Sequence, residues 1–126
     1  MTSSSHSNPP LVIVVDDDAA VRNALQFALE LQGYEVEVCE SGEALLERTL
    51  PDASACLVID ERLKGMSGLD TLNVLRRREV TLPAILITSN PQPQLRMKAK
   101  AARVPIVEKP LMGDGLVTAI RVALAP

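Results

Sequence analysis

The sequence predicts an α/β protein with a doubly wound architecture, in which helices cover both faces of a parallel sheet. Short segments rich in Val, Ile and Leu at residues 11–15, 55–59 and 83–88 are typical of strands that are buried on both faces. Segments with apolar residues at every third or fourth position lie between them, which indicates amphipathic helices. Strands that alternate with helices in this way form right-handed crossovers and a parallel sheet.

The composition limits the fold further. A chain of 126 residues fits one domain, and its only aromatic residues are Phe27 and Tyr34, so the core must be aliphatic. Cys39 and Cys56 are two isolated cysteines within apolar segments, which favours buried free thiols in a reducing compartment over a disulfide framework.

The charge and hydropathy patterns exclude several classes of function. The net charge of −3 argues against direct nucleic-acid binding over the whole surface. No apolar run reaches the length of a membrane span, and the Ser-rich start lacks the apolar segment of a signal peptide. We therefore expect a soluble cytoplasmic protein that contacts neither nucleic acid nor membrane.

The first half of the chain contains two strands and two helices. Residues 1–10 are small and polar and end in two prolines, so we expect a disordered tail followed by one domain at 11–126. The strand at 11–15 leads into a helix that ends near Gly33, because glycine readily ends helices. Residues 34–39 alternate like a more exposed strand, and Ser41 starts a second helix that continues to Leu50.

The second half repeats this alternation three times. The strand at 55–59 is followed by a helix that Ser67 can cap and that ends in three arginines. The strand at 83–88 precedes a helix expected at 92–102. Residues 104–107 form a short last strand, where Pro105 is tolerated if the strand lies at a sheet edge. The closing helix buries an apolar stripe that includes Leu116 and Ile120.

Polar residues follow four of the five predicted strands, and these residues are the candidates for chemistry. They are the Asp16–Asp18 cluster, Asp60, Thr88 and Lys109. The carboxyl ends of parallel strands meet at one sheet edge, where α/β proteins bind ligands. Carboxylates this close repel one another unless a cation lies between them, and oxygen ligands favour Mg²⁺. A metal and Lys109 could together neutralise a phosphoryl group on Asp60, with a hydrogen bond from the Thr88 hydroxyl.

Simpler explanations exist for each of these residues taken alone. Asp18 fits the N-cap of the first helix, where the helix dipole favours an acid. A single Asp after a strand, or Lys109 before Pro110, is often a turn residue, and Thr88 could be an ordinary strand end. None of these explanations accounts for the whole set in its order along the chain.

Four ordered motifs carry a family resemblance. They are Val-Val-Asp-Asp-Asp, Val-Ile-Asp-Glu-Arg-Leu-Lys-Gly-Met-Ser-Gly-Leu-Asp, Ile-Leu-Ile-Thr-Ser and Val-Glu-Lys-Pro. Over residues 11 to about 124 the chain resembles the receiver domain of two-component response regulators, and the second motif is closest to FixJ-type receivers. This resemblance implies a flavodoxin-like sheet of five strands in the order 2-1-3-4-5 with five helices.

The resemblance also implies a role for each site residue. Asp60 matches the phosphorylated aspartate, and Lys109 and Thr88 match the phosphate-contacting lysine and the switch hydroxyl. Asp16, Asp17 and the backbone carbonyl of Arg62 match the Mg²⁺ ligands, with Asp18 as a second register for the acidic pair. Pro110 matches a cis-proline, and Arg62 and Asn90 match positions that tune hydrolysis. The chain is then a phosphoacceptor and not a turnover enzyme, and its partner is a histidine kinase or histidine phosphotransferase.

The chain departs from the family pattern at its output side. Ile106 replaces the usual aromatic residue three positions before the lysine, and Pro91 and Pro93 crowd the start of the fourth helix. Our hypothesis is that residues 89–105 repack or become ordered on phosphorylation. The resemblance places the output face on the fourth helix, fifth strand and fifth helix. It also implies that the protein is a monomer or a phosphorylation-dependent dimer.

A basic segment belongs to the same region. No acid occurs between Glu79 and Glu108, and the spacing of Arg96, Lys100 and Arg103 places them on one helix face. This face is either a solvated surface or a docking site for an acidic signalling partner that the sequence does not identify.

Two other functions remain open. One is a Mg²⁺-dependent phosphatase with an aspartyl-phosphate intermediate, although that class usually carries its nucleophile on the first strand. The other is a degenerate receiver that binds partners without phosphorylation. The chain ends directly after the last helix, so we expect a stand-alone receiver, favoured by Met1 and the tail, or a piece of a longer regulator.

Overall fold

The structure is a computed structural model that describes residues 9–52, 54–111 and 113–125. Most of the predicted disordered tail, residues 1–8, lies outside the described residues. Within the described part of the chain, no helix is both long enough and apolar enough to cross a membrane.

Five parallel strands form one sheet in the order β2-β1-β3-β4-β5, as predicted. The strands are β1 (Leu11–Val15), β2 (Glu35–Cys39), β3 (Ala55–Asp60), β4 (Ala84–Thr88) and β5 (Ile106–Glu108). The helices that alternate with them are α1 (Ala19–Leu31), α2 (Gly42–Leu46), α3 (Gly68–Arg77), α4 (Pro93–Ala101) and α5 (Gly115–Leu124).

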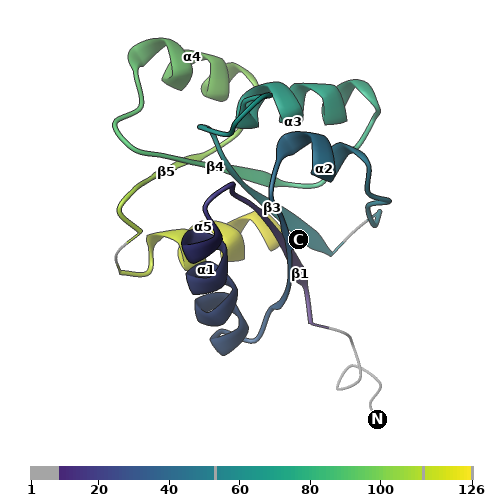
Figure 1. The fold of residues 1–126 in the computed structure, drawn as a ribbon, viewed down its shortest axis with the longest axis vertical. Helices are drawn as coiled ribbons and strands as arrows, with labels where there is room; N and C mark the ends of the chain where they lie inside the picture. The colour runs from purple at the N-terminus through teal and green to yellow at the C-terminus, as the bar shows by residue number, and fades with distance from the viewer. Residues whose placement is uncertain (1–8, 53, 112, 126) are drawn as a thin grey trace.

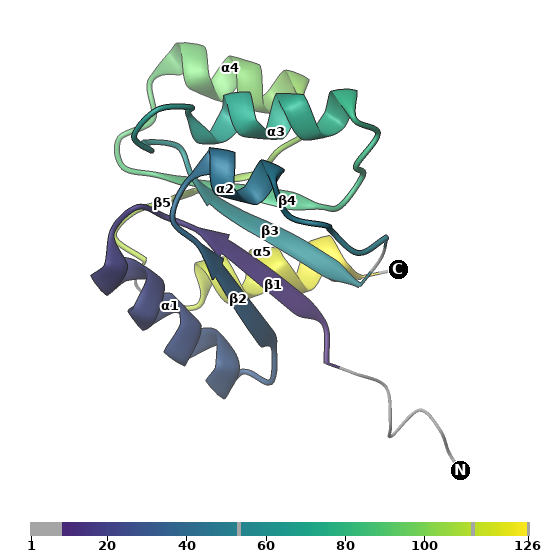
Figure 2. The ribbon, with the colours of Figure 1, turned by 45° about the vertical axis from the view of Figure 1, so that its right-hand side comes forward.

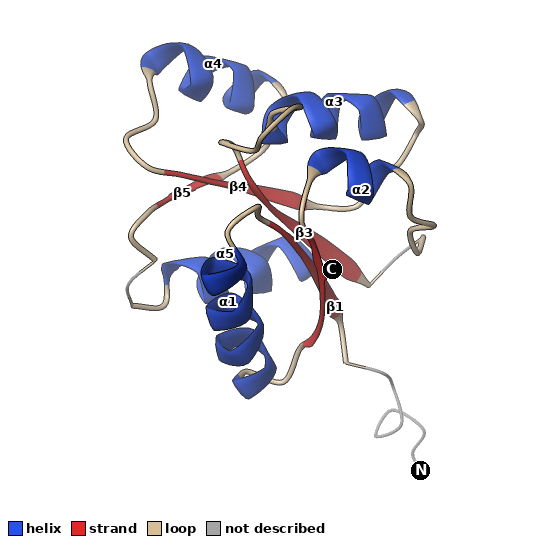
Figure 3. Ribbon diagram, in the orientation of Figure 1, coloured by secondary structure: helices blue, strands red, loops and turns tan. Residues whose placement is uncertain are grey.

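The helices divide between the two faces of the sheet. Helices α1 and α5 cover one face, and α2, α3 and α4 cover the other (Figures 1, 2 and 3). Side chains of a strand alternate between the faces, so Leu57 and Ile59 pack towards α2–α4 while Cys56 and Val58 pack towards α1 and α5. All six residues of β3 are buried, which explains the continuous apolar pattern that identified this strand.

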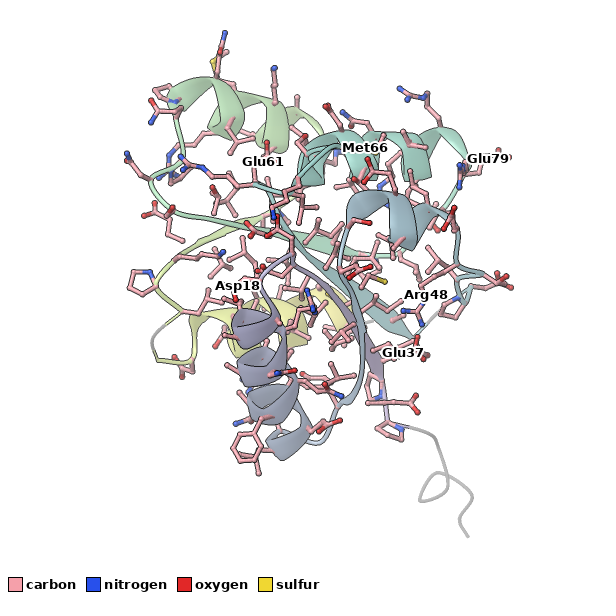
Figure 4. The ribbon with its side chains drawn as sticks, in the orientation of Figure 1. Asp18, Glu37, Arg48, Glu61, Met66 and Glu79 are labelled. Carbon is pink, nitrogen blue, oxygen red and sulfur yellow. The ribbon has the colours of Figure 1, made fainter. Side chains whose placement is uncertain are left out.

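Two elements are shorter than the sequence pattern predicts. Helix α2 ends at Leu46 rather than Leu50. The side chain of Arg48, two residues beyond this end, bonds with Cys39 and Glu37 of β2, and Figure 4 labels Arg48 and Glu37. The proline at position 51 disfavours a helical conformation at the residue before it.

Strand β5 begins two residues later than expected. The backbone N–H of Val104 donates to the carbonyl of Ala99, at an N–O distance of 2.8 Å, and so closes the end of α4. Pro105 has no N–H to donate to the sheet, and its carbonyl accepts from Leu86 of β4. Strand β5 is the edge strand next to β4, which confirms the position predicted from the proline.

Candidate functional site

Three carboxylates meet at the carboxyl edge of the sheet. Asp60 is the last residue of β3, and Asp16 and Asp17 follow β1. One oxygen of each lies within 4.8 Å of the others. Only 1% of Asp16 and 4% of Asp60 is exposed, whereas Asp17 is half-buried, so two of the three charges are largely shielded from water. This confirms the convergence predicted from the strand ends.

Lys109 supplies the positive charge of this pocket. Its Nζ lies 3.0 Å from Oδ2 of Asp60, to which it donates a hydrogen bond, and 3.6 Å from Oδ2 of Asp16. Burial alone disfavours the ammonium ion, but the hydrogen bond and charge of Asp60 outweigh it and raise the pKa of Lys109. The lysine follows β5, and its bond to Pro110 is cis, as the family resemblance implied.

The buried carboxylate of Asp16 is only half satisfied. Its Oδ1 accepts a hydrogen bond from the Asp18 amide at 2.9 Å. Its Oδ2 is buried without a hydrogen-bond partner among the residues that the structure describes. Burial raises the pKa of Asp16, and the neighbouring charge of Asp60 adds to this effect. A cation beside this oxygen would satisfy it, and the all-oxygen donor set fits a hard divalent ion such as Mg²⁺.

The three consecutive aspartates have different roles in the structure. Asp18 is the N-cap of α1, where its Oδ1 accepts from the amides of Ala20 and Val21 at 2.9 and 3.4 Å. Asp16 and Asp17 point into the pocket. The alternative register with Asp18 in the acidic pair is therefore wrong.

Carboxylates hold the loop that follows Asp60, which we call the acceptor loop (residues 61–67). The alternating amides of Arg62, Lys64 and Met66 donate to carboxylates at 3.2, 3.1 and 3.1 Å. The three acceptors are, in the same order, Asp60, Asp17 and Glu43. Figure 4 shows Glu61 and Met66 on this loop, next to the start of α3.

The start of α3 packs directly on the end of β3. Ser67 caps the helix, as predicted, because its Oγ accepts from the Asp70 amide at 3.1 Å. A Cβ atom at Gly68 would lie 2.4 Å from the carbonyl oxygen of Asp60, so only glycine permits this approach. Glu61 accepts from the Leu69 amide at 2.8 Å. Burial raises its pKa, and the charges of Asp70 and Asp60 contribute.

The remaining predicted site residues lie around the pocket. Thr88 is buried at the end of β4, and its hydroxyl makes a long hydrogen bond, 3.4 Å, to the carbonyl of Ser89. Arg62 and Asn90 are both exposed, and Asn90 has a left-handed backbone with φ of 46°.

The predicted basic face is smaller than the sequence suggested. Arg96 forms an ion pair with Glu108 of β5, and Arg103 lies beyond the end of α4 with φ of 59°. The prediction that Arg96, Lys100 and Arg103 share one helix face is therefore wrong for Arg103. Ile106 is half-buried at the start of β5.

Several residues of the site were missed by sequence reasoning. Arg22 donates to the backbone carbonyl of Asp16 at 2.7 Å. Glu43 holds the acceptor loop, and Glu61 ties this loop to the first turn of α3. Glu43 stands 23 residues before the amide that it accepts from, so only the fold reveals the contact. Arg22 lies one helical turn after Asp18, and this spacing could have predicted that its side chain reaches the acidic cluster.

A groove opens beside Lys109. It has a volume of about 400 Å³ and lies between α1 and the segment after β5, lined by Val21, Ala24, Leu25, Ala28, Lys109, Pro110 and Leu111. Its walls are mainly apolar, which is the usual character of a surface that a partner covers.

Comparison with known proteins assigns the family. The family model for the response regulator receiver domain matches residues 12–121 of this chain. Nodulation protein W of Bradyrhizobium diazoefficiens is 35% identical over 115 residues, which cover 90% of this chain and 51% of that protein. The transcriptional regulatory protein FixJ of the same organism is 32% identical, with 98% of this chain and 58% of that protein covered. The chain thus spans about half the length of these curated relatives.

Solved structures agree with this assignment. The crystal structure of FixJ-N superimposes with a TM-score of 0.83 and 30% identity, and covers 93% of this chain and 94% of that one. The response regulator TrrA from Thermotoga maritima, solved in complex with Mg²⁺-BeF, has a TM-score of 0.78 and 25% identity, with 91% of this chain and 99% of that one covered. With the five-stranded sheet and the carboxylates at its carboxyl edge, these matches show that the chain belongs to the response regulator receiver domains of two-component systems and is of the FixJ type.

Proposed function

We propose that Asp60 accepts a phosphoryl group from a histidine kinase or histidine phosphotransferase in a reaction that requires Mg²⁺. The observation that carries this proposal is the Asp60 carboxylate, buried between Lys109 and the Asp16 and Asp17 carboxylates. The related receiver TrrA was solved with Mg²⁺-BeF, which supports the same chemistry here.

The proposed transfer moves the phosphoryl group from a phosphohistidine to Asp60 and takes one proton from solvent. An oxygen of Asp60 attacks the phosphorus atom of the phosphohistidine, so a P–O bond forms and the P–N bond breaks. The other ring nitrogen of the imidazole takes up the proton, so the ring leaves in its neutral form. Lys109 pairs with the phosphoryl oxygens, and the Thr88 hydroxyl rotates to donate to them.

The proposed Mg²⁺ ligands are Asp16, Asp17, Asp60 and the backbone carbonyl of Arg62. When bound, the ion supplies positive charge next to the phosphoryl oxygens. Without it, the pocket holds three carboxylates and one lysine, so a phosphoryl group, which is also negative, could enter only at a high electrostatic cost.

The phosphorylated product is an acyl phosphate, which water cleaves. Arg62 and Asn90 are exposed on the two loops that flank Asp60, so we propose that they govern how water reaches the phosphorus atom. The chain therefore undergoes one phosphorylation and a slow hydrolysis and does not turn over substrates as a phosphatase does.

A comparison of two phosphate donors tests this function. We expect acetyl phosphate with Mg²⁺ to be consumed to one equivalent per chain, followed by slow hydrolysis. A generic phosphomonoester should not be turned over. Continuous turnover of the monoester would support the phosphatase alternative, and no reaction with either donor would support the phosphorylation-independent receiver.

Transfer from a protein donor requires a docking surface next to Asp60. We propose that the groove between α1 and Pro110–Leu111 contacts the kinase or phosphotransferase, because it is apolar and contains Lys109 in its wall. We propose that the protein is located in the cytoplasm. Kinase and phosphotransferase donors of this kind act there, and its reducing conditions fit the two buried free thiols, Cys39 and Cys56.

The exposed basic residues of α4 and of the turn after it, which contains Arg103, are proposed to contact an acidic signalling partner. The double substitution Lys100→Glu and Arg103→Glu should weaken partner capture about 5- to 50-fold at low salt, because several favourable charge pairs become repulsive. The expected difference shrinks as salt rises. Arg77→Glu on α3 is the matched control, since it also reverses an exposed arginine. An affinity that does not change with salt or with the double substitution would show that this surface is only solvated.

Switching is proposed to involve residues 89–105, because Ile106 replaces the usual aromatic residue. The expected result is a change in amide hydrogen exchange across this segment when beryllofluoride and Mg²⁺ are added. The Arg96–Glu108 ion pair joins α4 to β5 and is a contact that such repacking would break. Unchanged exchange in residues 89–105 would contradict this hypothesis.

A further inference from the structure

The acceptor loop is held from two directions, and only one of them is the acidic pocket. Asp60 and Asp17, which accept from the amides of Arg62 and Lys64, both belong to the pocket. The third acceptor, Glu43, comes from α2 on the far side of the loop, where its Oε2 lies 3.1 Å from the amide nitrogen of Met66. Hydrogen bonds therefore attach the loop to the pocket on one side and to α2 on the other.

The side chain of Glu43 is not needed by its own helix. Ser41 caps α2 through its Oγ, which accepts from the Ala44 amide at 3.0 Å. An acid in the first turn is favoured by the helix dipole wherever its side chain points. The dipole therefore explains an acid at this position but does not explain its contact with Met66.

The loop is shaped to receive this carboxylate. Gly65 has a left-handed backbone with φ of 79°, and a Cβ atom there would lie 2.7 Å from Oε2 of Glu43. The backbone conformation favours glycine here, and the absence of a Cβ atom leaves room for the carboxylate end of Glu43 beside the loop. The two features occur at the residue immediately before Met66, whose amide makes the hydrogen bond.

Helices α2 and α3, which flank the loop, are fixed relative to each other. Gly42 packs so closely against Thr71 that a Cβ atom at Gly42 would lie 2.0 Å from the Thr71 hydroxyl oxygen. That hydroxyl donates to the carbonyl of Ser67 at 2.8 Å, at the end of the acceptor loop. The contact between α2 and α3 therefore fixes the position of Glu43 relative to the acceptor loop.

We infer that Glu43 is a positioning residue for the divalent cation, which rests on the proposed Mg²⁺-dependent function. By holding the Met66 amide, it keeps the loop at the distance from β3 at which the Lys64 amide meets Asp17. The same loop carries the Arg62 carbonyl, a proposed metal ligand. Because the ligands are then placed before the ion arrives, less ordering is required on binding, and the affinity for Mg²⁺ is higher.

Two substitutions of Glu43 and one matched control test this inference in the protein without phosphate donors. Glu43→Ala removes the acceptor, Glu43→Gln keeps an oxygen acceptor but removes the charge, and Glu47→Ala removes an exposed acid from the end of the same helix. Amide hydrogen exchange of Gly65 and Met66 is measured without metal, and the Mg²⁺ dissociation constant is measured by calorimetry.

Glu43→Ala should speed exchange at Met66 and weaken Mg²⁺ binding, each by about 3- to 10-fold, the effect expected for one exposed hydrogen bond to a charged acceptor. Glu43→Gln should retain most of both properties, and Glu47→Ala should match the unsubstituted protein. The inference is overturned if Glu43→Ala leaves either quantity unchanged, or if Glu43→Gln and Glu47→Ala lower Mg²⁺ affinity as much as Glu43→Ala, since a general loss of negative charge would then suffice. Failure of the unsubstituted protein to bind Mg²⁺ would contradict the proposed function itself.

Discussion

Replacing Lys109 with methionine is expected to slow phosphorylation of Asp60 by acetyl phosphate about 100- to 1000-fold, as the loss of one preorganised hydrogen-bond donor to the reacting oxygens does in enzymes. Lys109 is the cation that contacts Asp60, at 3.0 Å, and methionine retains the length of the side chain without the charge. Rates of adduct formation, followed by intact mass at fixed Mg²⁺, measure the effect.

The same substitution should lower the stability of the metal-free protein. Without Lys109, the buried carboxylates of Asp16 and Asp60 lose their counter-ion, which costs about 1–3 kcal/mol of unfolding free energy for a pair that is partly open to water. Mg²⁺ should restore part of the loss, because it replaces the missing charge. Lys100→Met removes an exposed lysine from α4 and serves as the control. Equal phosphorylation rates for Lys109→Met and Lys100→Met would contradict the assigned role of Lys109.

Replacing Asp16 with asparagine is expected to stabilise the metal-free protein increasingly as pH rises. The pKa of Asp16 lies above its ordinary value of 3.8 because of burial. The folded protein therefore keeps this proton at pH values where the unfolded chain has released it. Its stabilising contribution is complete below pH 3.8 and disappears as pH rises through the raised value. Above the raised pKa, the ionised Asp16 destabilises the folded protein, and asparagine removes this charge.

Mg²⁺ should reverse this order of stability. At a Mg²⁺ concentration of 100 times the dissociation constant, the unsubstituted protein gains about 2.7 kcal/mol of unfolding free energy by mass action, while Asp16→Asn gains less because a ligand has lost its charge. Chemical denaturation at pH 4 and pH 7, with Mg²⁺ or with a chelator, measures both effects. A stability difference between the two proteins that is independent of pH and of Mg²⁺ would show that the charge of Asp16 neither destabilises the metal-free protein nor binds Mg²⁺.

Local sequence signals predicted the backbone of the fold well. The first strand, the caps at Asp18, Ser41 and Ser67, and the parallel sheet all follow from patterns within a few residues, and the structure contains each of them. The convergence of Asp16, Asp17 and Asp60 followed from the rule that parallel strands end at the same edge.

Tertiary contacts explain what the sequence could not predict. Arg48, beyond the end of α2, pairs with Glu37 of β2. Arg96 of α4 pairs with Glu108 of β5, which reduces the basic face. Each of these pairs joins residues from different elements, at separations of 11 and 12 positions. Periodicity within one helix gives no information on such partners. The role of Glu43 could not be predicted for the same reason, since Glu43 lies on α2 and the amide of Met66 that it binds lies on the acceptor loop.

The identity of the phosphorylated residue is the point on which the proposed function depends. Incubation with acetyl phosphate and Mg²⁺, followed by intact mass spectrometry, compares the unsubstituted chain with Asp60→Ala and with Asp52→Ala. The second substitution removes an exposed acid that precedes the amino end of β3, whereas Asp60 lies at its carboxyl end. We expect one phosphoryl adduct on the unsubstituted chain and on Asp52→Ala, and none on Asp60→Ala. A phosphoryl adduct that survives in Asp60→Ala would contradict the assignment of Asp60 as the phosphoacceptor.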